Sequence, residues 1–257
     1  RIGLEGNFEY FNYSLPENPY EELPSIGINN DAHFTQYPEF ENHAEATLSP
    51  YYKLEGDNWH VRLGANVMFI TGDNSKVTAS PNVSADIEVA DKTVLYAAAT
   101  GKQHSNSMYE VAQMNRYTQT TRELLPSRNW LDATIGLKSG VAPGFWFNIF
   151  GGYKATKNDV FFYPSTWSMV AEKIFANVSR PLQLESKKLF VGANLKYSYQ
   201  QLFDINLKGV YNNWKVEDNS IENAPDYKAY GKPEMELNAG ITVRPIKNVS
   251  ASLDYYL

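Results

Sequence analysis

Two loop residues of this chain, Asp31 and His33, could together do acid–base chemistry. They form an Asp-x-His sequence in the stretch "NNDAHF", and a carboxylate beside an imidazole can hold or pass a proton near neutral pH. Some barrel-shaped enzymes keep such residues near the rim, so the pair could serve as a hydrolase site. Two solvated polar residues on a loop explain the same sequence more simply. We therefore expect no catalytic residue and predict that the chain is not an enzyme.

Metal and cofactor chemistry has little support in the sequence. The chain has no Cys, which excludes thiolate zinc sites and Cys nucleophiles. Glu41, His43 and Glu45 alternate along one stretch, so they would share a strand face and could bind a cation. Polar residues that face water explain them better, and the sequence contains no P-loop, GxGxxG, HExxH, GxSxG or EF-hand pattern. We expect no metal and no cofactor.

Arginine and aromatic side chains gather in two predicted loops. Guanidinium groups bind carboxylate or phosphate through paired hydrogen bonds, and aromatic ring faces cover the apolar parts of a ligand. The mixture could grip an anionic or sugar-like ligand, or it could form a short helix or folded loop with a solvated charged face. The residues predicted to contact a ligand are Arg116, Tyr117, Arg122 and Arg128 in the loop Lys102–Arg128, and Trp167 in the loop Ala155–Lys187.

The elements that must position these loops are β-strands. In "NWHVRLGANVMF", residues 58–69, Val61 and Leu63 fall on one set of alternate positions and His60 and Arg62 on the other. Successive side chains of a strand point to opposite faces, so this stretch has one apolar and one mostly polar face. The alternation recurs and predicts eleven strands, near residues 2–10, 44–54, 58–69, 77–89, 93–101, 129–141, 145–154, 188–200, 204–215, 234–245 and 249–257.

The connections between these strands alternate between long and short. Tight turns are expected at residues 56–58, 90–92, 142–144, 201–203 and 246–248, and longer connections at 14–42, 72–76, 102–128, 155–187 and 216–233. In an up-and-down sheet, alternate connections lie at the same end. One end would therefore carry only tight turns and the other all the long loops, as in outer-membrane barrels.

Strand length and composition favour lipid contact for the apolar face. About twelve residues at ~3.3 Å each, tilted near 40°, span roughly 30 Å, which is close to the hydrocarbon thickness of a bilayer. Aromatic residues, 14% of the chain, gather towards strand ends, where membrane interfaces favour them. No apolar run reaches the ~18 residues of a membrane helix. A net charge of −6 argues against nucleic acid as the main partner.

We predict an all-β fold, an antiparallel up-and-down transmembrane β-barrel of about 11–12 long strands. Residues 1–257 would form a single barrel domain or barrel section without a separate plug domain. Single-chain bacterial barrels have an even number of strands, so eleven implies either a missed strand, most plausibly within Ser165–Pro181, or a section of a larger barrel, which we favour. Beginning at Arg1 without Met or signal peptide, the chain is expected to be a mature or excised piece.

Three segments resemble a known family. They are "NVSADIEVADKTVLYAAATG", "SRNWLDATIGLKSGVAPGFWFNIFGGYKATKNDVFFYPS" and "YGKPEMELNAGITVRPIKNVSASLDYYL". They resemble barrel portions of TonB-dependent-receptor-like outer-membrane proteins of Gram-negative bacteria, over about residues 77–257. The resemblance implies uptake of a scarce nutrient, energised from the inner membrane, with a plug domain inside the barrel. The chain itself shows neither a plug nor an energy-coupling box.

The predicted function is therefore solute passage or ligand uptake through an outer-membrane β-barrel of a Gram-negative bacterium, porin-like or receptor-like. Its lumen would be polar and its extracellular loops would select the solute. Expected partners are membrane lipid or lipopolysaccharide, a small solute or nutrient and, by the resemblance, a plug or an inner-membrane energy-coupling protein, but no nucleic acid. The alternative is a soluble antiparallel β-sandwich or surface module that binds glycans through its aromatic residues.

Overall fold

The computed structural model describes residues 1–13, 42–72, 75–118, 124–140, 142–169, 172–217, 227–246 and 248–257, with only the backbone for 164–169 and 172–178. Within these residues the chain forms eleven strands and one short helix, α1 (Met108–Met114). The strands are β1 (Ile2–Phe11), β2 (His43–Glu55), β3 (Trp59–Ile70), β4 (Lys76–Ala90), β5 (Thr93–His104), β6 (Ser127–Ser139), β7 (Phe145–Met169), β8 (Glu172–Tyr199), β9 (Phe203–Glu217), β10 (Met235–Ile246) and β11 (Val249–Tyr256).

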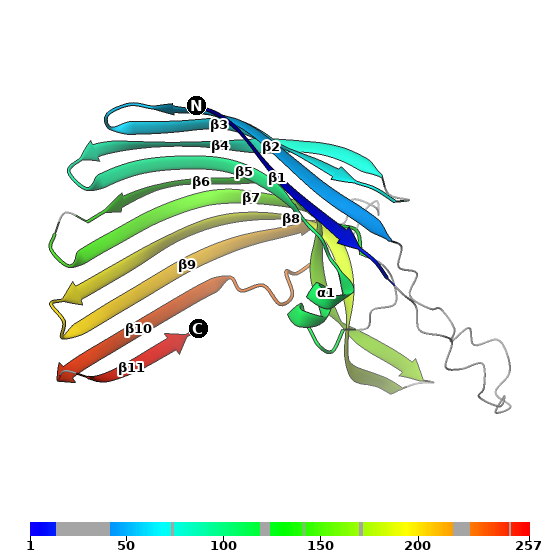
Figure 1. Cartoon of the computed structure of the whole chain (residues 1–257). Helices are drawn as coiled ribbons and strands as arrows, with labels where there is room; N and C mark the ends of the chain where they lie inside the picture. Colours follow the sequence, from blue (N-terminus) through cyan, green and yellow to red (C-terminus); the bar gives the residue numbers. More distant parts are fainter. Residues whose placement is uncertain are drawn as a thin grey trace, which may run out of the picture.

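All eleven strands belong to one curved sheet. Their order in the sheet is their order in the chain, and each strand pairs antiparallel with the next. The sheet bends into a wall (Figure 1), and no pairing between β1 and β11 closes it within the described residues. The up-and-down β architecture predicted from the alternation is confirmed. Whether residues 1–257 form a single barrel domain or a section of a larger barrel stays a prediction.

The ladder registers place the apolar residues of neighbouring strands on one face. Ala85 of β4 lies opposite Val61 of β3 and Ala97 of β5, and Ala97 lies opposite Ile135 of β6. Ile135 keeps 58% of its surface exposed. Apolar side chains that adjoin one another across four strands and remain exposed are unusual on monomeric soluble proteins. Such a face marks a surface that contacts lipid or another protein.

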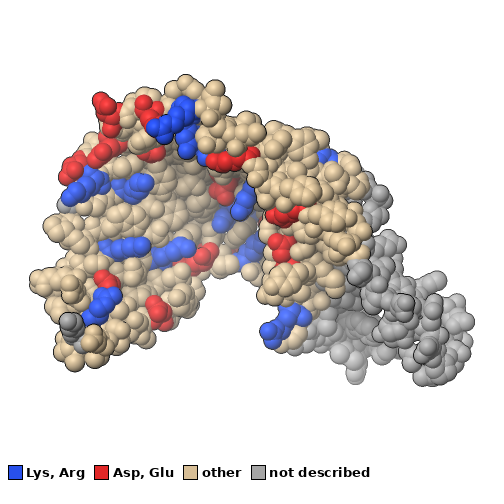
Figure 2. Space-filling view, viewed as in Figure 1, with Lys and Arg blue, Asp and Glu red and all other residues tan. Residues whose placement is uncertain are grey.

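The opposite face is polar and hollowed. Figure 2 shows side chains of Lys, Arg, Asp and Glu around the hollow of the curved sheet. Since side chains alternate across each strand, the face carrying Ala85 and Ile135 is the outer face, and the polar residues line the inner face. Among the described residues, no helix is long and apolar enough to span a membrane.

The two ends of the sheet differ as predicted. At the left in Figure 1, short connections follow the strand ends at Glu55, Ala90, Ser139, Tyr199 and Ile246. Four of these connections have a residue with positive φ: Lys92, Gly144, Gln200 and Asn248. Beside one turn the rings of Tyr199 and Phe203 stack with centroids 5.5 Å apart. We call this the turn end, and we call the opposite end, which carries α1, the outer end.

One predicted loop is wrong. The stretch 155–187 was expected to be a loop, but β7 and β8 continue through it as a hairpin that extends beyond the rest of the sheet (Figure 1). The ladder shifts register between Thr156 and Asp159 and again between Pro164 and Thr166. A bulge inserts an extra residue and switches the face on which later side chains lie, so the alternation breaks while the strand continues. No additional strand forms within Ser165–Pro181, because its described residues belong to β7 and β8.

Candidate functional site

Paired polar side chains line the inner face of the sheet. Glu5 of β1 accepts a hydrogen bond from Arg62 of β3 at 2.8 Å, bridging over β2. Asp204 of β9 pairs with Arg244 of β10 at 2.5 Å. One pair connects strands that β2 separates and the other connects adjacent strands, and in each pair the two charges offset one another. An inner surface of charged and amide groups can hold water and contact a polar solute.

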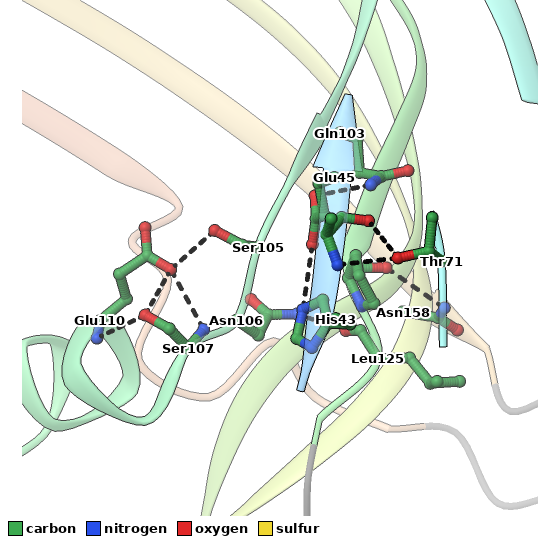
Figure 3. Close-up of polar contacts among 12 residues, drawn as sticks. His43, Glu45, Thr71, Gln103, Ser105, Asn106, Ser107, Glu110, Leu125 and Asn158 are labelled. Atoms are coloured by element: carbon green, nitrogen blue, oxygen red, sulfur yellow. Dashed lines mark hydrogen bonds and ion pairs between the residues drawn. The ribbon is translucent and has the colours of Figure 1, made fainter. Parts of the chain in front are cut away.

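The connection between β5 and β6 is a folded unit at the outer end. Ser107 caps α1 by accepting from the backbone N–H of Glu110, and the Glu110 carboxylate accepts from the backbone N–H of Ser107 (Figure 3). This reciprocal capping box satisfies two donors that a short helix would otherwise leave free. Asn106 donates to the Leu125 carbonyl at 2.6 Å and to the Ser127 hydroxyl at 2.9 Å. The helix is therefore tied to the start of β6.

The bulge at Asn158 joins this unit to the extended hairpin. Asn158 has φ +54°, and its carbonyl accepts from the Ser127 hydroxyl at 2.6 Å and from Gln183 Nε2 at 3.2 Å. Gln183 Oε1 in turn accepts from the backbone N–H of Leu125 at 2.9 Å. The bulge thus turns a backbone carbonyl away from the ladder and uses it to connect three segments.

Glu45 is the most enclosed acidic side chain of the inner face near the outer end. It is 9% exposed, accepts from Gln103 Nε2 at 2.6 Å and lies 3.7 Å from His43 Nε2 (Figure 3). Glu41, its expected partner in a cation site, lies outside the described residues. No group of three or more His, Cys, Asp or Glu residues suited to a metal ion occurs in the part of the chain that the structure describes. The contacts of Glu45 join β2 to β5.

A small buried cluster fixes the far part of the hairpin. Phe161, Leu184 and Val216 pack together from β7, β8 and β9. Beside them, Lys232 from the segment before β10 forms an ion pair with Asp159 at 2.5 Å and lies 4.3 Å from the centre of the Phe161 ring. Burial lowers the pKa of the Lys232 ammonium, and the Asp159 carboxylate opposes that shift. The pair attaches the segment before β10 to the hairpin.

A second charge cluster lies at the outer end of β9. Lys187 and Lys215 both contact the Glu217 carboxylate, at 2.8 Å and 2.5 Å. Their hydrogen bonds lower the pKa of Glu217 to about 2. Position 217 lies fourteen residues from the start of β9 at the turn end. That is about 35 Å along the barrel axis at ~3.3 Å per residue and a 40° tilt, beyond the membrane-spanning part of a barrel strand.

The predicted ligand residues do not all come together. Arg116 and Tyr117 are exposed and follow α1, where the Tyr117 carbonyl accepts from the backbone N–H of Ser179 on β8 at 3.0 Å. Trp167 lies on β7 opposite Ile174, further along the same hairpin. The structure therefore brings the first loop against the hairpin that contains the second. Whether these residues bind a ligand stays a prediction.

Arg128 occupies a separate place. Its Nη2 donates to the Ala79 carbonyl of β4 at 2.7 Å. The described ladder between β4 and β5 begins only at Asn82, so Ala79 lies where these strands have separated, and the guanidinium supplies a donor there. Arg122, Asp31 and His33 lie outside the described residues.

Sequence reasoning missed the residues that organise the outer end. Asn158 and Asp159 stand in "KND" within a stretch assigned to a loop, and Lys232 lies in another predicted loop. The available signal was the apolar run "VFFY" directly after "KND", which a continuing strand explains. Their partners are distant in the chain, Lys232 being 73 positions from Asp159, so the local pattern gives no sign of the contact.

The fold is similar to those of solved membrane transporters and receptors. The copper transporter OprC is 12% identical with a TM-score of 0.54, and the match covers 84% of this chain and 35% of that one. The FrpB iron transporter from Neisseria meningitidis is 12% identical with a TM-score of 0.52, covering 85% and 33%. The ferripyoverdine receptor of the outer membrane of Pseudomonas aeruginosa is 13% identical with a TM-score of 0.51, covering 84% and 32%.

The similarity between this chain and these solved structures is a similarity of fold alone. The chain spans about a third of the length of the solved structures that it matches. Comparisons with protein-family models and with curated proteins find no match. The structural neighbours are transporters and receptors rather than enzymes. The predicted resemblance to the barrel portion of TonB-dependent outer-membrane receptors is confirmed at the level of the fold.

Proposed function

We propose that this chain forms part of the wall of a β-barrel in the outer membrane of a Gram-negative bacterium and takes part in the uptake of a small ligand. The observation that carries this proposal is the two-faced sheet. Apolar residues such as Val61, Ala85 and Ile135 are aligned by the ladders on the outer face, while ion pairs and amides line the inner face. This arrangement suits lipid outside and a polar passage inside.

The neighbours support uptake of a ligand. Two are named as transporters of copper and iron, and the third is a receptor bound to ferripyoverdine. Energy coupling, a plug inside the barrel, and contact with lipid or lipopolysaccharide follow for this chain from the resemblance and belong to the proposal. So does the role of Arg116, Tyr117 and Trp167 as ligand contacts at the outer end. We propose binding and passage without covalent chemistry or a resident cofactor.

The membrane assignment is tested by fractionation. The protein should sediment with lipopolysaccharide on a sucrose gradient and leave the membrane only in detergent. Recovery as a monomer in detergent-free buffer would instead support the glycan-binding surface module. Uptake is then tested in cells with and without the gene. Ferric citrate and copper(II) serve as metal probes, and D-glucuronate serves as a probe that is both anionic and a sugar. Equal accumulation of all three in both strains would refute uptake of these solutes.

Two modes of passage can be separated in the same cells. A receptor energised from the inner membrane should lose accumulation of its solute when a protonophore collapses the proton gradient. A porin-like barrel should keep equilibrating the solute under that treatment. Swelling of proteoliposomes in isosmotic arabinose gives an independent readout, because a passive channel admits arabinose and a plugged receptor does not.

A further inference from the structure

A recess of about 400 Å³ opens on the inner face of β7 to β11, towards the turn end. This volume lies within the range of roughly 300–1,000 Å³ typical of small-molecule sites. The recess is far along the wall from the predicted ligand residues beside α1. Its principal lining side chains are Trp146, Asn194, Lys196, Asn206, Lys208 and Asn238.

The strand registers assemble this recess. Lys196 of β8 lies opposite Trp146 of β7 and opposite Asn206 of β9, and its Nζ is 5.6 Å from the centre of the Trp146 ring. Lys208 of β9 lies opposite Asn194 of β8, with Asn238 on its other side in β10. One aromatic ring, two ammonium groups and three amides thus share one area of the inner face.

The recess carries excess positive charge. Neither Lys196 nor Lys208 forms an ion pair with any described residue, whereas Arg244 nearby is paired with Asp204. Asp254 is the one carboxylate among the residues that line the described recess. Two ammonium groups against one carboxylate attract an anion to this part of the inner face.

One of the amides that line the recess has no hydrogen-bond donor for its oxygen in the described part of the chain. Asn194 Oδ1 is enclosed and accepts no hydrogen bond from the described residues. Leaving a buried acceptor unsatisfied costs about 1–3 kcal/mol. A hydroxyl donor entering the recess could reach this oxygen after a small rotation of the amide. The orphaned acceptor therefore favours a ligand with hydroxyl groups.

We propose that this recess binds an anionic sugar of the hexuronate class. The two ammonium groups of Lys196 and Lys208 receive the carboxylate, and the Trp146 ring packs against an apolar C–H face of the sugar. Asn194 and the other two amides offer both donors and acceptors to the ring hydroxyls. The assignment rests on the proposed uptake function, for which it names the substrate class and a contact on the path through the barrel.

The test compares D-glucuronate with D-glucose by isothermal titration of the intact protein extracted from its membrane in detergent. We expect D-glucuronate to bind at least tenfold more tightly than D-glucose, which lacks the carboxylate. The variant K196Q/K208Q should weaken D-glucuronate binding at least tenfold. The control K53Q/K102Q removes the same charge from β2 and β5, away from the recess, and should stay within twofold of the unchanged protein.

A second variant guards against loss of folding. N194D changes one amide to a carboxylate of nearly the same shape and should repel D-glucuronate. The mobility shift between unboiled and boiled samples in SDS reports the fold of every variant. Absence of D-glucuronate binding to the unchanged protein, equal binding of D-glucose, or full binding to folded K196Q/K208Q would each overturn the proposal.

The recess and the uptake function can fail separately. Loss of D-glucuronate binding in K196Q/K208Q, with cells that still accumulate ferric citrate or copper(II), would confirm the recess as a uronate site and leave uptake of another solute intact. Binding to the recess without accumulation of any probe in cells would refute uptake while keeping the site. Accumulation of D-glucuronate without binding at the recess would refute the recess alone.

Discussion

Replacing Ala85 with arginine tests whether the outer face contacts lipid. Ala85 lies on that face between Val61 and Ala97 and is exposed. It is five residues before Ala90 at the end of β4. At ~3.3 Å per residue and a tilt near 40°, this places it about 13 Å from the turn end. The apolar band of a barrel is roughly 25 Å tall, so Ala85 lies near its middle.

An arginine at this depth should be costly. Arg at the bilayer midplane of a barrel destabilises it by about 2–4 kcal/mol relative to a small apolar residue. At 1.4 kcal/mol for each factor of ten, the ratio of folded to unfolded protein should fall about 30- to 700-fold. Because Ala85 is small and exposed, the substitution removes little packing, and the loss reports mainly the transfer of the charge into lipid.

The adjacent Ser84 provides the matched control. It is also exposed, but it lies on the inner face opposite Arg62, whose guanidinium is already paired with Glu5. Ser84→Arg places the same charge one residue away in water and should change the free energy of unfolding by no more than about 0.5 kcal/mol. Urea unfolding in phospholipid vesicles, followed by Trp fluorescence, measures both variants. Equal costs for the two, or no cost for Ala85→Arg, would refute the lipid assignment.

Three further predictions follow from the same structure. Leu195 lies four residues before the end of β8, and Leu195→Arg should lower the free energy of unfolding by about 2–4 kcal/mol. Val61 is the third residue of β3, beside a tight turn, and Val61→Arg should lower it by only about 0–1 kcal/mol. Equal losses for the two variants in the same urea assay would contradict this dependence on depth. Lys232→Met leaves the Asp159 carboxylate without its cation and should lower the free energy of unfolding by about 1–3 kcal/mol. Residues 227–233 should also be cleaved faster by a protease. An unchanged rate of cleavage would show that the ion pair does not attach this segment to the hairpin. The pKa of Glu217 is about 2 in the folded protein, below its usual value, so its stabilising effect is full above about pH 5 and is lost as the pH falls towards 2. Glu217→Gln should remove this part of the dependence of the free energy of unfolding on pH. Identical pH profiles for the two proteins would contradict the prediction.

Much of the sheet could be predicted because strand alternation is a local property. The starts and ends of β2, β3, β4 and β9 lie within two residues of the predicted bounds, and the five tight turns are where residue types indicated them. The extension of β7 and β8 could not be predicted in the same way. The bulge at Asn158 shifts the register, and past it the apolar residues change face, so the period of two no longer identifies a strand.

The predicted binding residues show the limit of composition as a guide. Arg128 was grouped with Arg116 because both lie in one arginine-rich stretch. The structure gives the Arg128 guanidinium a backbone carbonyl of β4 as a partner, while Arg116 remains exposed beyond α1. Which of two similar side chains is available to a ligand depends on where neighbouring strands separate. That separation is visible only in the ladders.

By itself the sequence determined that the chain is a long-stranded, two-faced antiparallel sheet with its elaborate connections at one end. Those properties depend on the order of residue types within single strands and turns. The tertiary structure alone decided which inner residues meet. Lys196 faces Trp146 across fifty positions, and Lys232 reaches Asp159 across a larger gap, because hydrogen-bonded register and bulges set these contacts. A shift of one residue would change every cross-strand partner while leaving the composition of each strand unchanged.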